Sequence, residues 1–599
     1  PPSIPRSRWG RPPTRRAAPG PRPPPAEYAR PTGCKAPCEV LRRPPAALGE
    51  CLADGRTRMF SLFQTNAGGE RLINIWGRLG TGTSMTDMSL SGILRVVLSV
   101  YRAPGVLGAF AGYLLAWITA PLSQWLFIPI GAAMGIVLAI CNDVRQGVIC
   151  NHLGLCKGGT SEGPGPDGER RPGLSEWLHD GIQASAGLER KDRPLTFRDL
   201  WCAPAYPGGP RQTCNEQDSA EHRAIDLQVI TTNVTHGRPY RLPNTDSRSR
   251  LFFKLKDLKD YFPQVVLDAL RRDARPYAPR TDSDPKDCAV PADLLELPVA
   301  DLPIVVAARL SLSCPLLISA VQLWAIDYEP KRGKRDLKPC QFTDGGVSSN
   351  FPIHLFDEAV PRWPTFGLWL DRESPYRPDE RVWLPEFQGQ GWGDAWNRFD
   401  PEAAGPKPLA YSRKDFKYLA GFLLGILTGG LDWNDRTTFR LPHVRNRVAR
   451  LLLRPGEGGL NIAMPRDKIL RMAHEYGTKA GRLFVERFAD EKGEPSRAWR
   501  EQRWIRMQLL FNGLRERLTN LRSSAQWASH AVPMAQAIEE AKGKSPIKDT
   551  ANRNKLSPEQ AESLQRLLTA LQDLEVELRA AEPSFSPELE PELRLRAPI

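Results

Sequence analysis

The chain has 599 residues, of which 41% are hydrophobic and 25% charged, enough apolar material for a folded protein with several domains. Its net charge of +14 favours acidic partners such as an anionic membrane surface. No zinc-finger, helix-turn-helix or basic-zipper pattern accompanies that charge, so we predict no nucleic-acid partner. The 11 cysteines are scattered along the chain, which indicates reduced thiols and not a disulfide framework.

The first 50 residues contain 14 prolines and nine arginines but only three acidic residues. A segment of this composition cannot bury enough apolar surface to offset the entropy of ordering. We therefore expect residues 1–60 to be disordered, either as a functional basic tail or as sequence without a selected fold. No signal peptide of the usual three-part design is recognisable there.

A run of 40 residues, Ala103 to Asn142, has no charged side chain. Pro121 separates two apolar halves, each near the lower length limit for crossing a bilayer. Arg102 and Arg145 flank the run, as expected for an apolar hairpin that touches a membrane. The alternative is a helical hairpin buried inside a large domain.

Helical and strand patterns then alternate, which predicts an α/β fold with a sheet flanked by helices. A helix is expected from Leu174, and strands at Ala224–Thr232 and Pro315–Val321. Apolar residues at helical spacing predict an amphipathic helix over 466–490 and another near 564–578.

The most informative segment is Phe342–Asp357, FTDGGVSSNFPIHLFD. A strand-like approach ends in Asp344, and Gly345 and Gly346 follow at once. Two glycines allow the chain to turn sharply and let another backbone or a substrate come close. The arrangement would hold a carboxylate at a loop tip, although Asp-Gly-Gly is also a common turn.

This segment resembles the patatin-like phospholipase family, in which the Asp of such a motif partners a serine in a Ser–Asp dyad. Other pieces are similar to the family in the expected order: Leu195–Trp201, Ile225–Pro243, Arg309–Val321, Asn350–Leu355, Phe366–Asp371 and Glu457–Met464. The resemblance covers roughly residues 145–490. It implies an acyl ester hydrolase with Asp344 as the base and no cofactor or metal.

The resemblance is weakest upstream, where the family carries a glycine-rich oxyanion loop and a G-x-S-x-G nucleophile elbow. Gly82-Thr83-Ser84 begins like that elbow but continues Met85-Thr86. Ser84 is therefore a weak candidate for the nucleophile. We expect this chain to lack a G-x-S-x-G elbow and to be inactive as it stands. His354 is expected at a helix start, and it does not complete a triad.

The predicted organisation has four parts. They are a disordered segment (1–60), a patatin-like domain incomplete at its N-terminal end (61–390, with the apolar hairpin at about 103–142), its C-terminal part (391–495) and a helical extension (496–599). We expect a membrane-associated lipid acyl hydrolase on the cytoplasmic side. The alternative is a catalytically dead protein that binds a membrane or a partner through the same fold.

Overall fold

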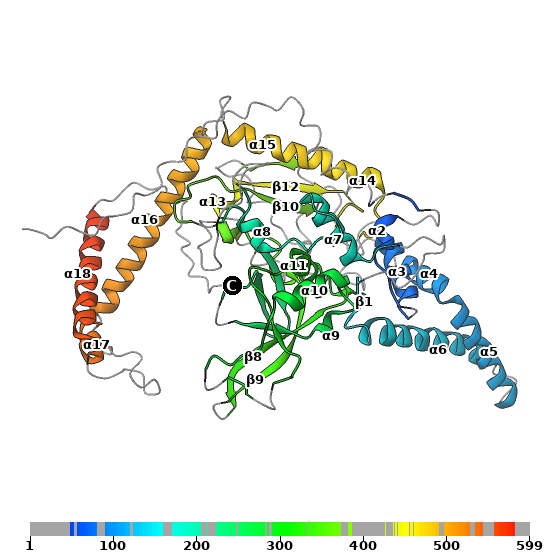
Figure 1. Cartoon of the computed structure of the whole chain (residues 1–599). Coiled ribbons are helices and arrows are strands. Elements are labelled where there is room, and N and C mark those ends of the chain that lie inside the picture. Colours follow the sequence, from blue (N-terminus) through cyan, green and yellow to red (C-terminus); the bar gives the residue numbers. More distant parts are fainter. Residues whose placement is uncertain are drawn as a thin grey trace, which may run out of the picture.

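The computed structural model describes most of the chain between residues 57 and 580. The described ranges are 57–66, 68–80, 90–119, 124–159, 171–204, 223–246, 249–281, 284–286, 290–331, 334–356, 358–372, 381–385, 438–439, 441–454, 456–458, 461–489, 496–526, 534–542 and 556–580, with 48, 50–52, 213, 426 and 435. Ser84 and most of the proline-rich start lie outside them. Figure 1 shows a central body of sheets and helices from which two helical arms project.

The largest sheet has seven strands in the order β3-β2-β9-β8-β4-β6-β5. Their bounds are β2 (Val229–Asn233), β3 (Arg238–Leu242), β4 (Leu251–Phe253), β5 (Arg275–Pro276), β6 (Leu295–Glu296), β8 (Val321–Lys331) and β9 (Lys334–Asp344). All its neighbouring strands run antiparallel. The predicted mixture of helix and strand is confirmed, and the topology of the sheet is that of connected hairpins.

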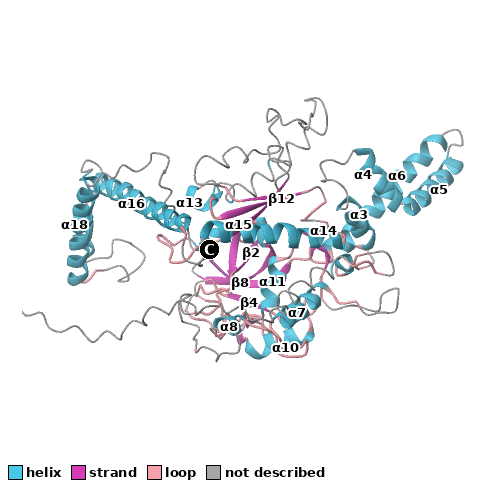
Figure 2. Cartoon of the chain, turned by 90° about the horizontal axis from the view of Figure 1, so that it is seen from above, coloured by secondary structure: helices cyan, strands magenta, loops and turns pink. Residues whose placement is uncertain are grey.

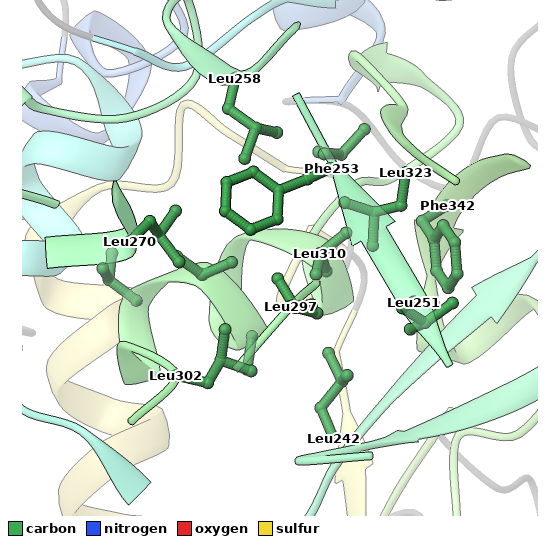
Figure 3. Close-up of a cluster of buried hydrophobic side chains, with 14 of the residues drawn as sticks. Leu242, Leu251, Phe253, Leu258, Leu270, Leu297, Leu302, Leu310, Leu323 and Phe342 are labelled. Carbon is green, nitrogen blue, oxygen red and sulfur yellow. The ribbon is translucent and has the colours of Figure 1, made fainter. Parts of the chain in front are cut away.

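The main core lies between this sheet and several helices. These helices are α7 (Leu174–Ser185), α8 (Phe197–Trp201), α9 (Leu255–Leu258), α10 (Gln264–Asp273) and α11 (Ile304–Ser311). Figure 3 shows core side chains from strands and helices converging, among them Leu242, Phe253, Leu270, Leu310 and Phe342, all fully buried. Burying one such side chain stabilises the fold by about 1.5–3 kcal/mol, so this cluster fixes β9 in place.

Two smaller sheets flank the large one. In the first, β1 (Gly154–Cys156) and β7 (Leu316–Ile318) pair in parallel. In the second, β12 (Val448–Leu453) lies between β10 (Gly367–Arg372) and β11 (Val382–Trp383). The expected strands at 224–232 and 315–321 are thus confirmed, each over a shorter span.

The uncharged run folds as an antiparallel pair of helices, α5 (Arg102–Thr119) and α6 (Gln124–Val144). The two helices meet through glycines, Gly108 and Gly112 on α5 and Gly131 and Gly135 on α6. A Cβ added at Gly108 would overlap with the carbonyl oxygen of Gly131, and one at Gly131 with that of Gly108. Small residues at this spacing let two helix backbones approach closely, an arrangement common in membranes.

The outer faces of this hairpin are exposed. Leu107 is 69% exposed and Leu138 63%. The helix Leu126–Ile149 is long and apolar enough to cross a membrane, and only 6% of its most apolar window is buried. The bent pair of helices formed by Gly92–Val100 and Arg102–Trp117, with an angle of 76° between them, is also long and apolar enough to cross a membrane when the two count as one span. The alternative of a hairpin buried within a domain is therefore wrong.

The hairpin follows the helices α2 (Arg58–Ser61), α3 (Glu70–Gly80) and α4 (Leu90–Val100), and an ion pair fastens the base of the hairpin to α3. Asp143, 1% exposed, accepts two hydrogen bonds from the Arg71 guanidinium at 2.6 and 2.7 Å. It also accepts one from the Tyr101 hydroxyl at 2.8 Å. These three hydrogen bonds offset the cost of burying the Asp143 charge. They therefore hold the base of the hairpin against the rest of the protein.

The helices that follow residue 496 form the second arm (Figure 1). The helix predicted over 466–490 is continuous from α14 (Arg466–Arg471) through the π-helix η8 (Met472–Gly477) to α15 (Thr478–Phe488). The predicted helical extension contains α16 (Arg497–Gln526), α17 (Met534–Ala541) and α18 (Pro558–Ala580). Viewed from above, this arm and the apolar hairpin lie at opposite ends of the described chain (Figure 2).

The expectation of reduced thiols is wrong for Cys202, which is disulfide-bonded. Six others within the described ranges are free thiols.

Candidate active site at the end of β9

The Asp-Gly-Gly segment lies where the sequence predicts it, at the end of a strand. Asp344 is the last residue of β9 and pairs with Thr231 of the neighbouring strand β2. A 3₁₀ turn, η5 (Gly345–Val347), follows at once. Phe342, two residues earlier, points into the main core, so the strand that delivers Asp344 is anchored by burial.

The Asp344 carboxylate is half-buried and accepts a hydrogen bond from the Gly346 amide at 2.7 Å. Burial raises the pKa of Asp344, and the Gly346 hydrogen bond offsets part of that rise. Within the described ranges no other group donates to this carboxylate. A carboxylate with a raised pKa and a largely unused set of acceptor sites is suited to accept a proton.

Gly345 is required by a close backbone contact, whereas Gly346 lies against a side chain. A Cβ at Gly345 would overlap with the carbonyl oxygen of Ile230 in β2, and one at Gly346 would overlap with the Asn350 side chain. The Asn350 amide also donates to the Gly346 carbonyl at 3.1 Å. The turn is therefore locked to both the sheet and the following loop.

A second segment, the turn after α11, holds Asp344 from the other side. The Ser313 carbonyl accepts from the Asp344 amide at 3.0 Å and from the Thr343 hydroxyl at 2.6 Å. Arg309 is fully buried and donates to the Ser313 hydroxyl at 2.6 Å. The same guanidinium donates to the carbonyls of Lys157 and Ser319 at 2.8 and 3.0 Å. Arg309 thus joins the exit of β1 to the turn that positions Asp344.

The serines nearest Asp344 in sequence are engaged elsewhere. The Ser348 hydroxyl lies 2.7 Å from that of Thr232, and Ser349 donates to Asp435 at 2.8 Å. Burial, and after it the charge of Asp344, raises the pKa of the Cys314 thiol to about 11, so this neighbour stays protonated at neutral pH. Among the described residues, therefore, no serine hydroxyl is hydrogen-bonded to Asp344.

Asp435 is a residue that sequence reasoning missed. Its carboxylate, 2% exposed, accepts from the Ser349 hydroxyl and from the amides of Asn350 and Phe351 at 2.6 and 3.1 Å. It closes the loop that follows the Asp-Gly-Gly turn. No local signal marks it, because it lies more than 80 residues further along the chain.

The expectation that the chain has no G-x-S-x-G is wrong. Residues 159–163 read Gly-Thr-Ser-Glu-Gly, so Ser161 occupies the serine position of that pattern. The pentapeptide itself is the signal that could have found it. Gly159 is described and lies three residues after β1, whereas Ser161 and Ser84 fall outside the described residues.

The structure also shows where two other predicted features lie, His354 and the segment Leu195–Trp201. His354 lies in the 3₁₀ turn η6 (Ile353–Phe356), near the expected helix start. Leu195–Trp201 forms the short helix α8, whose first turn is capped by Thr196 and Asp199. Within the described ranges, no three His, Cys, Asp or Glu side chains are grouped as metal ligands would be.

The chain is similar to a protein named RpoH suppressor from Rhizobium meliloti (strain 1021). The two are 33% identical over 467 residues, which cover 70% of this chain and 64% of the relative. The chain thus spans less than two thirds of the relative's length. No family model matches the chain, and no solved structure does.

The raised pKa of Asp344 makes a prediction about stability. Burial penalises the ionised form of Asp344, so the folded state is less stable at pH values above the raised pKa of this carboxyl. The cost disappears once the carboxyl is protonated. Asp344→Asn keeps an oxygen for the Gly346 amide and removes the charge. Its melting temperature at pH 7 should equal or exceed that of the wild type, with the difference vanishing toward pH 4. A variant that melts lower than the wild type at pH 7 but not at pH 4 would show instead that the ionised carboxylate stabilises the fold.

Proposed function

We propose that this chain carries a patatin-like lipid acyl hydrolase domain in which Asp344 is the catalytic base. The observation that carries the proposal is the Asp344 carboxylate itself, held at the end of β9 by Gly345, Gly346 and Ser313. It is half-buried, has a raised pKa and keeps unused acceptor positions. Perturbed carboxylates of this kind concentrate at functional sites.

The reaction of such a dyad needs no cofactor. A serine oxygen attacks the ester carbonyl while its proton passes to the Asp344 carboxylate, and the alcohol leaves with a proton. Water then attacks the acyl-serine, giving its proton to the same carboxylate and releasing the fatty acid. Backbone amides at a glycine-rich turn would stabilise the oxyanion in both steps.

The reaction also requires a serine nucleophile. Ser161 has the flanking glycines, and Arg309 links Lys157, four residues before it, to the Asp344 turn. A nucleophile elbow, however, joins a strand directly to a helix. Here residues 157–173 separate β1 from α7. We therefore propose that the chain as it stands hydrolyses esters poorly.

The rival function is a catalytically inactive protein that binds a membrane or a partner through the same fold. The apolar hairpin favours the membrane over a soluble partner, because its outer residues are exposed around both helices. We propose that α5 and α6 enter the bilayer together and that the site lies on the cytoplasmic side. The same contact would bring the hydrolase domain to its lipid esters.

Ester hydrolysis tests the role of Asp344. With p-nitrophenyl butyrate the chain should show little activity above background. A chain extended upstream by a strand, a G-x-S-x-G turn and a helix of the patatin type should gain activity. Asp344→Asn should then lower the rate by roughly 10²-fold or more.

Two outcomes of this assay would contradict the account. Hydrolysis that survives Asp344→Asn would reduce Asp-Gly-Gly to a structural turn. Strong hydrolysis by the unextended chain, lost in Ser161→Ala or Ser84→Ala, would identify that serine as a working nucleophile and overturn the expected inactivity.

Flotation with phosphatidylcholine vesicles tests the membrane contact. The wild type should float with the vesicles, whereas Leu107→Glu/Leu138→Glu should lose most of this binding, because each charge is costly within the apolar layer. The matched control is Leu368→Glu/Leu370→Glu on β10, whose side chains are 54% and 60% exposed. A wild type that stays monomeric and unbound would contradict the proposal.

A further inference from the structure

A second site lies on the large sheet, far from Asp344. It is a cavity of about 620 Å³, within the usual size range of small-molecule sites. Its walls come from the β2–β3 turn, the β8–β9 hairpin, the segment before β4 and the loop after β5. Arg335 on its wall and Asp344 are nine residues apart on β9, roughly 30 Å at about 3.3 Å per residue.

The wall of this cavity is rich in guanidinium groups. Four arginines and two aspartates contribute to it: Arg238, Arg250, Arg280, Arg335, Asp246 and Asp284. The wall therefore carries a net charge of +2 (4 − 2). Counting also Glu296, which lies behind the wall and pairs with Arg250 and Arg280, leaves +1 (4 − 3). An anionic ligand would balance this excess.

Ion pairs hold two of these arginines, Arg250 and Arg335, in position. Arg250, whose side chain is 5% exposed, forms a two-pronged pair with Glu296 at 2.7 and 2.9 Å. Asp284 accepts from the Arg280 and Thr281 amides and from Arg335. Burial opposes ionisation of Asp284, but these hydrogen bonds outweigh it and lower its pKa to about 2. The carboxylate therefore stays charged and fixes the loop that carries Arg280.

Two of the arginines retain unused donors. Arg238 uses Nη2 for the Tyr240 and Ser249 hydroxyls, and its Nε and Nη1 have no partner among the described residues. Arg280 uses Nη2 for Glu296, with Nε and Nη1 likewise unused there. The residues that line the cavity also include Ala325 and Ile326 of β8, which are 4% and 2% exposed.

We propose that this cavity binds a phosphate monoester, whose phosphate is held by the guanidinium groups of Arg238 and Arg280. A planar guanidinium presents paired N–H donors that match phosphate oxygens. A phosphate monoester carries close to two negative charges at neutral pH, which suits the excess on the wall. The ligand is either a soluble phosphate ester or the headgroup of an anionic lipid. The site does not depend on the hydrolase activity.

Calorimetric titration with glycerol 3-phosphate tests the soluble form. The wild type should bind, and binding should weaken as ionic strength rises. Arg238→Ala and Arg280→Ala should each raise the dissociation constant by roughly tenfold or more. The matched control is Arg241→Ala, which removes the same charge from the opposite face of β3 and should change binding less than about twofold.

A lipid source is tested with vesicles, using Leu107→Glu/Leu138→Glu so that the hairpin does not mask the result. Binding to vesicles containing phosphatidic acid but not to phosphatidylcholine alone, lost in Arg238→Ala/Arg280→Ala, would support the proposal with a lipid headgroup as ligand. The proposal is overturned if neither glycerol 3-phosphate nor these vesicles bind. It is also overturned if binding is equal in Arg238→Ala/Arg280→Ala and Arg241→Ala.

Discussion

The Arg309 guanidinium is the interaction on which the candidate active site depends. It is fully buried, and among the described residues its hydrogen-bond acceptors are two backbone carbonyls and the Ser313 hydroxyl, with no carboxylate. The guanidinium also lies over the Tyr261 ring, 5.5 Å from the ring centre. Burial lowers the pKa of Arg309 to about 10, so it remains charged at neutral pH. Burying such a charge is costly unless hydrogen bonds compensate it. The segments that supply those acceptors, at Lys157, Ser313 and Ser319, are therefore held together by one guanidinium group.

Strained backbone lies close to these contacts. Within the described ranges, the non-glycine residues with positive φ are His152, Leu153 and Leu316, all beside the β1–β7 pair. Ser319 spans this region, because its hydroxyl donates to the Asn151 carbonyl at 2.6 Å and its amide to the Cys156 carbonyl at 2.9 Å. Strain of this kind persists only where surrounding contacts over-determine the backbone. Here they bring the exit of β1 beside the Asp344 turn.

Local patterns predicted the features that depend on neighbouring residues. The hairpin could be predicted from the uncharged run between Ala103 and Asn142. A run without charged side chains forms helices that are apolar on every side. Asp344 lies at a strand end because Phe342 is buried and two glycines follow. The antiparallel order of the large sheet was not predictable, since it depends on pairings between strands more than 100 residues apart, such as β2 with β9.

The remaining parts of the sites come from contacts between distant segments. Asp435 reaches its loop across more than 80 residues, and the cavity beside Arg238 combines four separate segments. No sequence window contains both partners of such a contact. Ser161 is a different case, because its pentapeptide is local and can be read from the sequence alone.

Hydrogen–deuterium exchange in Arg309→Met tests most directly whether one buried guanidinium organises the site. The account predicts that peptides covering 154–159, 313–319 and 343–351 lose protection together. Peptides covering the β10–β12 sheet should exchange as in the wild type, and Arg241→Met should leave all of them unchanged. Loss of protection confined to 313–319, with 154–159 and 343–351 unaffected, would contradict it.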